Sequence, residues 1–344
     1  MEEQFYEKAK VKNGVLLKYE LEDAVQVTIP EGITELAEDA FEDGYCLESV
    51  QLPDSLAVLD SSAFNNCCNL SAFILSETNP HFTFDGTALF NKDKTVLIKV
   101  VPTYKGHYDI PDTVVTVGKM AFDNCDVASV TFPGSVKSIG NEAFSCCDKL
   151  TDVNLSVGLK EIGGEAFNCC NKLTSVAIPE GVTAIGWAAF SMCDNLASVT
   201  IPSSVTTIRG YAFSHCKALT AVTIPKGITT IETGAFRGCK NLTSLFFPEG
   251  VTTIGEGAFA LCEKLTAVTI PKSVTTIEEW KFEDWKAFPH RKPTVYALPG
   301  SVSWKWAEEK GFPVEKMKSG VCPYCGGKLK GLIFKKCTAC GNHK

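Results

Sequence analysis

Four cysteines near the C-terminal end form the clearest metal-binding pattern in the sequence. They lie in CPYCGGKLKGLIFKKCTAC as two C-x2-C pairs separated by eleven residues, at Cys322, Cys325, Cys337 and Cys340. Each pair presents two thiolates to one ion, and four thiolates complete the tetrahedral coordination that Zn2+ prefers. Because four cysteines leave no position for water or substrate, we expect this zinc to be structural and not catalytic.

The segment that carries these cysteines, residues 317–344, is too short for a hydrophobic core of its own. Zinc would supply its folding free energy, on the order of 10 kcal/mol or more. We therefore expect a separate small domain that is similar to a zinc ribbon.

The charge of this tail is opposite to that of the rest of the chain. From Lys316 to Lys344 there are seven lysines and no acidic residue, so this part carries +7 and the remainder −14, for a net charge of −7. Two hypotheses stand for these lysines: they contact nucleic acid or an acidic partner, or they form a solvated face around a stabilising module.

A repeat of 23 residues organises the chain before the tail. Residues 173–264 read as four consecutive copies of L-x-x-V-x-I-P-x-x-V-x-x-I-x-x-x-A-F-x-x-C, and we count ten copies in residues 27–286. A fixed period of this size is typical of stacked units that cannot bury their apolar faces alone. Phe190, Phe213 and Phe236 should therefore stack in single file.

Each copy contains the signals of one rung of a solenoid. V-x-I-P predicts a short strand that ends at proline, since proline cannot donate to a ladder. We expect the second Val and Ile to point inward, and a brief helical turn to carry the Ala-Phe pair into the core. Neighbouring rungs should then form one parallel ladder with strands about 4.8 Å apart.

Three segments depart from the repeat. Residues 1–26 are expected to cap the first rung and residues 287–316 the last, with a strand at 294–298 and a helix starting near Ser301 or Ser303. At about 77–107 the period breaks, and the apolar clusters 88–90 and 96–98 around polar 91–94 predict a hairpin. This insertion is either a functional element or a variant rung that continues the stack.

The other twelve cysteines lie in the repeats. Eight follow the repeat Phe by three residues and should form a buried column: Cys67, Cys125, Cys147, Cys170, Cys193, Cys216, Cys239 and Cys262. We interpret them as small apolar core residues, with redox or metal chemistry as the alternative. So many reduced thiols favour a reducing compartment. Cys46, Cys68, Cys146 and Cys169 lie off this column and should be more exposed.

No catalytic motif is visible. The sequence contains no H-E-x-x-H, G-x-S-x-G or Walker loop, and its five histidines fall at unrelated repeat positions. An enzyme would need clustered ionisable groups in a pocket, and the surroundings of the 77–107 insertion are the place to look. We predict a protein without enzymatic activity.

A stripe of small side chains on the strands is the candidate binding surface. The position between the inward Val and Ile holds mostly uncharged residues, of which we select Thr131, Asn154, Thr200, Thr223, Phe246 and Thr269. Phe246 is either an exposed aromatic anchor for a partner or a ring that packs against a neighbour.

The repeat resembles the BspA-like leucine-rich repeat family from about residue 11 to about residue 316. The resemblance implies a curved α/β repeat solenoid, with short parallel strands on its concave face, and binding proteins that are often cell-surface or secreted adhesion modules. Our leading hypothesis is a monomeric, adhesin-like scaffold that binds a protein or peptide on that face. The alternative is an intracellular adaptor whose basic zinc ribbon contacts nucleic acid or an acidic partner.

The location of the protein is a separate expectation. No signal peptide and no membrane span is visible, which favours the cytoplasm, whereas the resemblance implies the surface or secretion.

Overall fold

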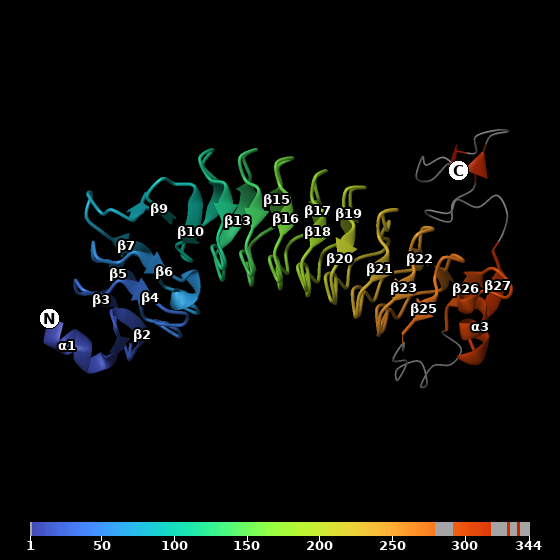
Figure 1. The fold of residues 1–344 in the computed structure, drawn as a ribbon, viewed down its shortest axis with the longest axis horizontal. Coiled ribbons are helices and arrows are strands. Elements are labelled where there is room, and N and C mark those ends of the chain that lie inside the picture. Colours follow the sequence, from blue (N-terminus) through green and yellow to red (C-terminus); the bar gives the residue numbers. More distant parts are fainter. Residues whose placement is uncertain (1, 279–291, 318–328, 331–335, 338–344) are drawn as a thin grey trace. The chain divides into compact units, whose positions relative to one another are not determined.

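The computed structural model describes residues 2–278, 292–317, 329–330 and 336–337. The chain divides into two compact units, Met1–Asn171 and Lys172–Lys344, which we call the first and second unit. Each unit is a stack of short rungs (Figure 1).

Most rungs contribute two strands, one to each of two parallel ladders. The rung of residues 219–241 has a strand only in the second ladder, and the pairing of neighbouring strands is interrupted along both. The first ladder is built from the strand centred on the first Val of the repeat, and the second ladder from the strand that ends at the second Ile. Both are parallel because equivalent residues one period apart are paired, as Val176 is with Val199 and Ile185 with Ile208. The stack of rungs is therefore confirmed, whereas the expectation of one ladder is corrected to two.

The first unit begins with α1 (Glu2–Lys8) and the antiparallel hairpin of β1 (Ala9–Lys12) and β2 (Val15–Tyr19). Asn13 (φ 52°) and Gly14 (φ 78°) form its turn in the left-handed region that such turns require. The first-ladder strands are β3 (Gln26–Thr28), β5 (Ser49–Gln51), β7 (Ala72–Ile74), β11 (Gly106–Asp109), β13 (Val127–Thr131) and β15 (Asp152–Asn154). The second-ladder strands are β4 (Glu35–Leu36), β6 (Val58–Leu59), β10 (Val96–Val100), β12 (Thr116–Val117), β14 (Ser138–Ile139) and β16 (Glu161–Ile162).

The insertion at 77–107 holds antiparallel strands at the two apolar clusters. These are β9 (Ala88–Asn91) and β10, which pair with each other, and β8 (Phe82–Phe84) pairs with β9 on its other side. Strand β10 also pairs in parallel with β12, so the insertion is joined to the second ladder.

The second unit repeats this arrangement. Its first-ladder strands are β17 (Ser175–Ala177), β19 (Ser198–Thr200), β22 (Ser244–Phe246), β24 (Ala267–Thr269), β26 (Thr294–Ala297) and β27 (Val314–Lys316). Its second-ladder strands are β18 (Ala184–Ile185), β20 (Thr207–Ile208), β21 (Thr230–Ile231), β23 (Thr253–Ile254) and β25 (Thr276–Ile277). Helix α3 (Val302–Glu309) contacts β25, β26 and β27, and its N-cap Ser301 accepts a hydrogen bond from the Trp304 amide at 3.2 Å.

The segment that carries Ala-Phe into the core is not the helical turn that the sequence predicts. Among the described rungs, only η1 (Ser61–Phe64) is helical there. Elsewhere left-handed residues flank the Phe, such as Tyr211 (φ 57°) and His215 (φ 58°) around Phe213. The Phe213 amide donates to Ala235 O at 2.9 Å, in the next rung, instead of to a carbonyl of its own turn. Hydrogen bonds between rungs therefore replace the internal bonds of a helix.

The core of each unit contains a column of parallel phenyl rings. Phe190, Phe213 and Phe236 stack with centroids 5.5 Å apart, and Phe259 follows at 5.6 Å. In the first unit Phe122, Phe144 and Phe167 stack at 4.4 and 4.9 Å. The predicted single file of rings is confirmed.

The cysteine column is also confirmed. All eight residues have at most 1% of their surface exposed, while Cys46 and Cys68 are exposed and Cys146 and Cys169 half-buried. The eight cysteines of the column are therefore part of the core, as the repeat period predicts.

Candidate binding face

The outward side of the first ladder carries the residues selected from the sequence. Side chains alternate along a strand, so a buried central residue is flanked by two outward ones. Val153 is buried between exposed Asp152 and Asn154, and Val176 between exposed Ser175 and Ala177. Stacking of rungs turns these outward pairs into two rows of side chains, which we call the ladder face of each unit.

The structure brings some of the selected residues together. In the first unit, Thr131 is paired in register with Asn154 on the neighbouring strand. In the second unit, Phe246 is paired with Thr269, and Thr200 lies beside Ala177. Thr223 is exposed, although its segment forms no regular strand. Thr131 and Thr269 are half-buried.

Phe246 is not an exposed anchor. Its side chain is only 8% exposed, so the reading in which the ring packs against neighbours is the one that agrees with the structure. The register places Thr269 beside it and Tyr296 one strand further. Since strands in a ladder are about 4.8 Å apart, a ring at this position reaches its neighbours and loses contact with solvent.

A hydrogen-bonded cluster around His107 lies on the ladder face of the first unit. His107 Nδ1 is 2.7 Å from Ser129 Oγ, and His107 Nε2 is 3.0 Å from Asp109 Oδ1 and 3.2 Å from Thr131 Oγ1. His107 and Asp109 are outward residues of β11, and Ser129 and Thr131 are their neighbours on β13. The cluster therefore adds three residues to the selected Thr131.

Sequence reasoning missed this cluster because it treated the histidines as scattered. The signal was present, since His107-Tyr108-Asp109-Ile110-Pro111 matches the x-V-x-I-P part of the repeat. That match places His107 and Asp109 outward on the strand next to Ser129. Only the return of the period after the insertion shows which rung follows which.

The His107 cluster presents fixed hydrogen-bonding groups on an open face. With Nε2–H directed to Asp109, the neutral ring accepts from Ser129 at Nδ1. The types of residue match a hydrolytic triad, but the side chains of His107 and Asp109 are 49% and 77% exposed. Oxyanion stabilisation is strongest in a site from which water is excluded, and this cluster is open to water.

Within the insertion, strand β10 carries a lysine whose burial the sequence did not reveal. Lys99 is 1% exposed, and its Nζ donates to Met120 O at 3.0 Å. Burial lowers the pKa of Lys99, while nearby Asp123 acts in the opposite direction. The inward position on β10 makes this amine part of the core and removes it from any surface role.

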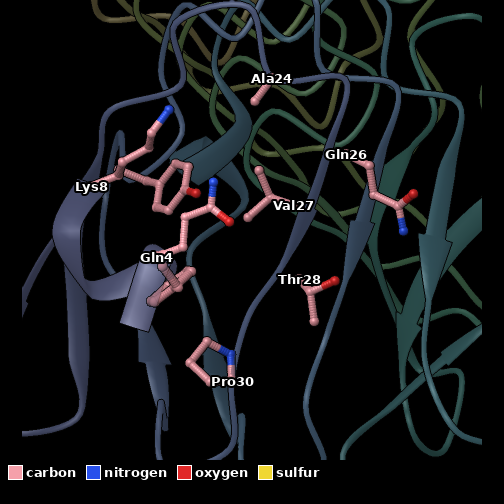
Figure 2. A pocket seen from close by; sticks show the side chains of 9 residues that line it. Gln4, Lys8, Ala24, Gln26, Val27, Thr28 and Pro30 are labelled. Atoms are coloured by element: carbon pink, nitrogen blue, oxygen red, sulfur yellow. The ribbon is translucent and has the colours of Figure 1, made fainter. Parts of the chain in front are cut away.

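A hollow of about 420 Å3 lies at the N-terminal end of the first unit (Figure 2). Gln4 and Lys8 of α1 line one side and Gln26, Val27 and Thr28 of β3 the other. This hollow is separate from the His107 cluster, which lies on β11 and β13.

The predicted zinc ligands lie mostly beyond the described residues. Cys322, Cys325 and Cys340 are outside them, and Cys337 belongs to β29 (Lys336–Cys337), which pairs antiparallel with β28 (Leu329–Lys330). In the part of the chain that the structure describes, no group of three or more His, Cys, Asp and Glu residues is arranged to hold a metal. Over the same residues, no helix has the length and apolar character to cross a membrane.

Comparison with known proteins agrees with the geometry. The family described as "BspA type Leucine rich repeat region" matches residues 19–96, 106–220 and 206–288. The solved structure of a leucine-rich repeat protein from Eubacterium ventriosum is 25% identical, with a TM-score of 0.64, over 74% of this chain and 66% of that chain. This chain thus spans slightly less than two-thirds of that protein.

Further solved structures are less similar in shape. The T. pallidum leucine rich repeat protein is 31% identical over 55% of this chain and 89% of its own, with a TM-score of 0.47. A leucine rich cell surface protein from Faecalibacterium prausnitzii is 23% identical over 89% of this chain and 94% of its own, with a TM-score of 0.42. A search of the curated proteins finds no match. Because the family match covers more than half of the residues, this chain belongs to the BspA-type leucine-rich repeat family.

Proposed function

We propose that this protein is a non-enzymatic scaffold that binds a protein or peptide on its ladder face. The observation that carries the proposal is a set of exposed, short and mostly uncharged side chains at the same position of successive repeats, with Asn154 in the first unit and Ala177, Thr200 and Thr223 in the second. Membership of the leucine-rich repeat family supports the proposal, because stacked repeats form extended surfaces of the kind that bind partners. In this proposal the ladder face is the concave side of the solenoid, the role is adhesin-like, and the chain acts as a monomer.

The physical basis is that a partner can approach such a surface closely at a small entropic cost. Short side chains on hydrogen-bonded strands lose little conformational freedom when they are covered, whereas long flexible side chains lose about 0.5–1.5 kcal/mol each. The His107 cluster adds polar groups whose directions are set before binding. It is therefore the part of the ladder face where we place hydrogen-bond specificity.

The proposal is tested by placing bulk on the face. The full chain would be applied to an array of purified extracellular-matrix and cell-surface proteins, and any binding measured again after Thr131→Arg, Asn154→Arg and Thr200→Arg. Each arginine should weaken binding at least tenfold where the partner covers that rung. Thr206→Arg is the matched control, because Thr206 is an exposed residue of the same repeat as Thr200 but lies outside the ladder face. Binding that survives all three ladder-face substitutions would rule out this surface.

A second candidate function rests on the tail. We propose that Cys322, Cys325, Cys337 and Cys340 hold one structural zinc, which ties the two C-x2-C pairs together. The antiparallel pairing of β28 with β29 fits a ribbon, since β28 lies between the two C-x2-C pairs and β29 ends at Cys337, the first cysteine of the second pair. Zinc would supply the cross-link, and the lysines would then contact nucleic acid or an acidic partner. Salt-dependent nucleic-acid binding that disappears on deletion of residues 317–344 would support this adaptor role.

A further inference from the structure

The first ladder of the first unit ends at an open edge. Strand β3 pairs with β5, and no other described strand pairs with it. Val25 O accepts from the Ser49 amide at 3.2 Å, and the Ile29 amide donates to Gln51 O at 3.0 Å. Because backbone groups alternate between the two edges of a strand, the N–H and C=O groups of the intervening Gln26 and Thr28 point away from β5.

The N-terminal cap closes the second ladder but not the first. Strand β1 pairs antiparallel with β2, and β2 pairs in parallel with β4, so β1 covers the end of the second ladder. At the equivalent end of the first ladder, a hollow of about 420 Å3 separates β3 from α1. Its volume is in the range of about 300–1,000 Å3 that is typical of ligand sites.

The walls of this hollow indicate what it accepts. In Figure 2, Gln4 on α1 extends across it towards Val27 on β3. The polar side chains on the α1 side are Gln4 and Lys8, which both carry N–H donors, and no carboxylate lines the hollow. The Lys8 ammonium pairs with Glu22 at 2.6 Å, which occupies one of its three N–H donors.

We propose that this edge binds an extended peptide segment of a partner protein, which adds a strand to β3 and occupies the hollow. Two residues with outward N–H and C=O groups form a pattern that another polypeptide strand matches, and main-chain pairing of this kind is an established mode of peptide recognition. The side chain of the peptide that faces α1 should carry an acceptor oxygen, preferably a carboxylate, because Gln4 and Lys8 supply the donors. This site uses the backbone edge of β3, whereas the ladder face uses outward side chains, and Gln26 and Thr28 belong to both.

The test uses a proline and an alanine at one position of the full chain. A blocked octapeptide that alternates Glu with Val would be titrated by fluorescence anisotropy, beside its Lys–Val counterpart. Thr28→Pro removes the outward N–H group from an edge strand, a position where proline is tolerated, whereas Thr28→Ala keeps that group. We expect Thr28→Pro to bind at least tenfold more weakly than Thr28→Ala, because the two variants both lack the Thr28 hydroxyl and differ in the outward N–H group. Gln4→Trp, which fills the hollow from α1 without changing β3, should also reduce binding.

Hydrogen exchange and sedimentation complete the test. Bound peptide should slow exchange of the Gln26 and Thr28 amides and leave those of β15 unchanged. The proposal is overturned if the Glu–Val peptide shows no binding at millimolar concentration, if Thr28→Pro binds it like Thr28→Ala while both keep the unfolding midpoint, or if the Lys–Val peptide binds equally well. Self-association that Thr28→Pro abolishes would identify a second copy of the chain as the occupant and would also overturn it.

Discussion

The Sγ atom of Cys239 donates a hydrogen bond to the carbonyl oxygen of Phe213, 3.1 Å away. The two residues are 26 positions apart, which is one repeat of 23 residues plus the three residues from Phe to Cys. The same bond, at 3.0–3.3 Å, joins Cys67 to Phe41, Cys147 to Phe122, Cys170 to Phe144, Cys216 to Phe190 and Cys262 to Phe236. The thiols therefore link neighbouring rungs, which explains a cysteine at this position better than size alone.

Removal of one thiol should weaken the stack measurably. Cys239→Ala loses a hydrogen bond worth about 1 kcal/mol and leaves a small cavity, so we expect the free energy of unfolding to fall by about 1–2 kcal/mol. Urea denaturation followed by circular dichroism measures this. Cys46→Ala, at an exposed cysteine, is the control and should change stability by less than about 0.5 kcal/mol. Equal effects of the two substitutions would contradict the structural role of the column.

The phenyl column should be the most sensitive part of the core. Phe236 lies between Phe213 and Phe259, with ring centroids 5.5 and 5.6 Å away, and it is fully buried. Phe236→Ala should reduce the free energy of unfolding by about 3–5 kcal/mol, and Phe236→Leu by less than half as much. Thermal and urea unfolding provide the measurement. Trp187→Ala, at a half-exposed aromatic residue, is the control, and a loss below about 1 kcal/mol for Phe236→Ala would contradict the ring stack.

Stability should decrease at alkaline pH. Burial raises the pKa of Cys67, Cys125 and Cys262 from 9.0 to about 12, so the folded chain keeps protons that the unfolded chain releases between these values. The stability that each thiol contributes is complete below pH 9 and is lost as pH rises towards 12, by about 1.4 kcal/mol per pH unit. Lys99 acts with the opposite sign, because its lowered pKa makes the unfolded state bind more protons below pH 10.5, but it is one group against several.

Urea denaturation in the presence of a reductant, at pH 8, 9, 10 and 11, measures this slope. Cys262→Ala should make the decrease in the free energy of unfolding with pH less steep, by the contribution of one thiol. A free energy of unfolding that stays constant from pH 9 to 11 would show that these thiols are not buried in the folded chain.

The His107 ring should be held in one tautomer. With Asp109 accepting from Nε2–H and Ser129 donating to Nδ1, the neutral ring carries its proton on Nε2. Long-range 15N–1H spectra of histidine-labelled protein at pH 8 distinguish the two nitrogens. Ser129→Ala should keep the Nε2–H tautomer, whereas Asp109→Ala leaves Nε2–H only the Thr131 hydroxyl at 3.2 Å and should shift the population towards Nδ1–H. A mixture of tautomers in the unchanged chain would contradict the arrangement.

The tail should bind one zinc ion per chain. Protein purified without chelators and analysed by mass spectrometry for metals should contain one equivalent, and Cys322→Ser should lose it because three thiolates hold zinc less tightly than four. Cys68→Ser, at an exposed cysteine of the repeats, should retain the metal. Full zinc content in Cys322→Ser would show that the tail cysteines are not the ligands.

The repeat alone was sufficient to predict the stacked rungs, the file of Phe190, Phe213 and Phe236, and the buried thiols. The reason is that a strict 23-residue period places equivalent residues one above another, so a pattern along the chain becomes a pattern in space. By contrast, the second ladder and the left-handed residues around Phe213 depend on hydrogen bonds from one rung to the next, and no local pattern reports them. Phe246 is buried by neighbours on adjacent strands, and Lys99 is buried because the insertion places it on the inward side of β10. His107 lies beside Ser129 because β11, at the end of that insertion, pairs in parallel with β13 of the following rung.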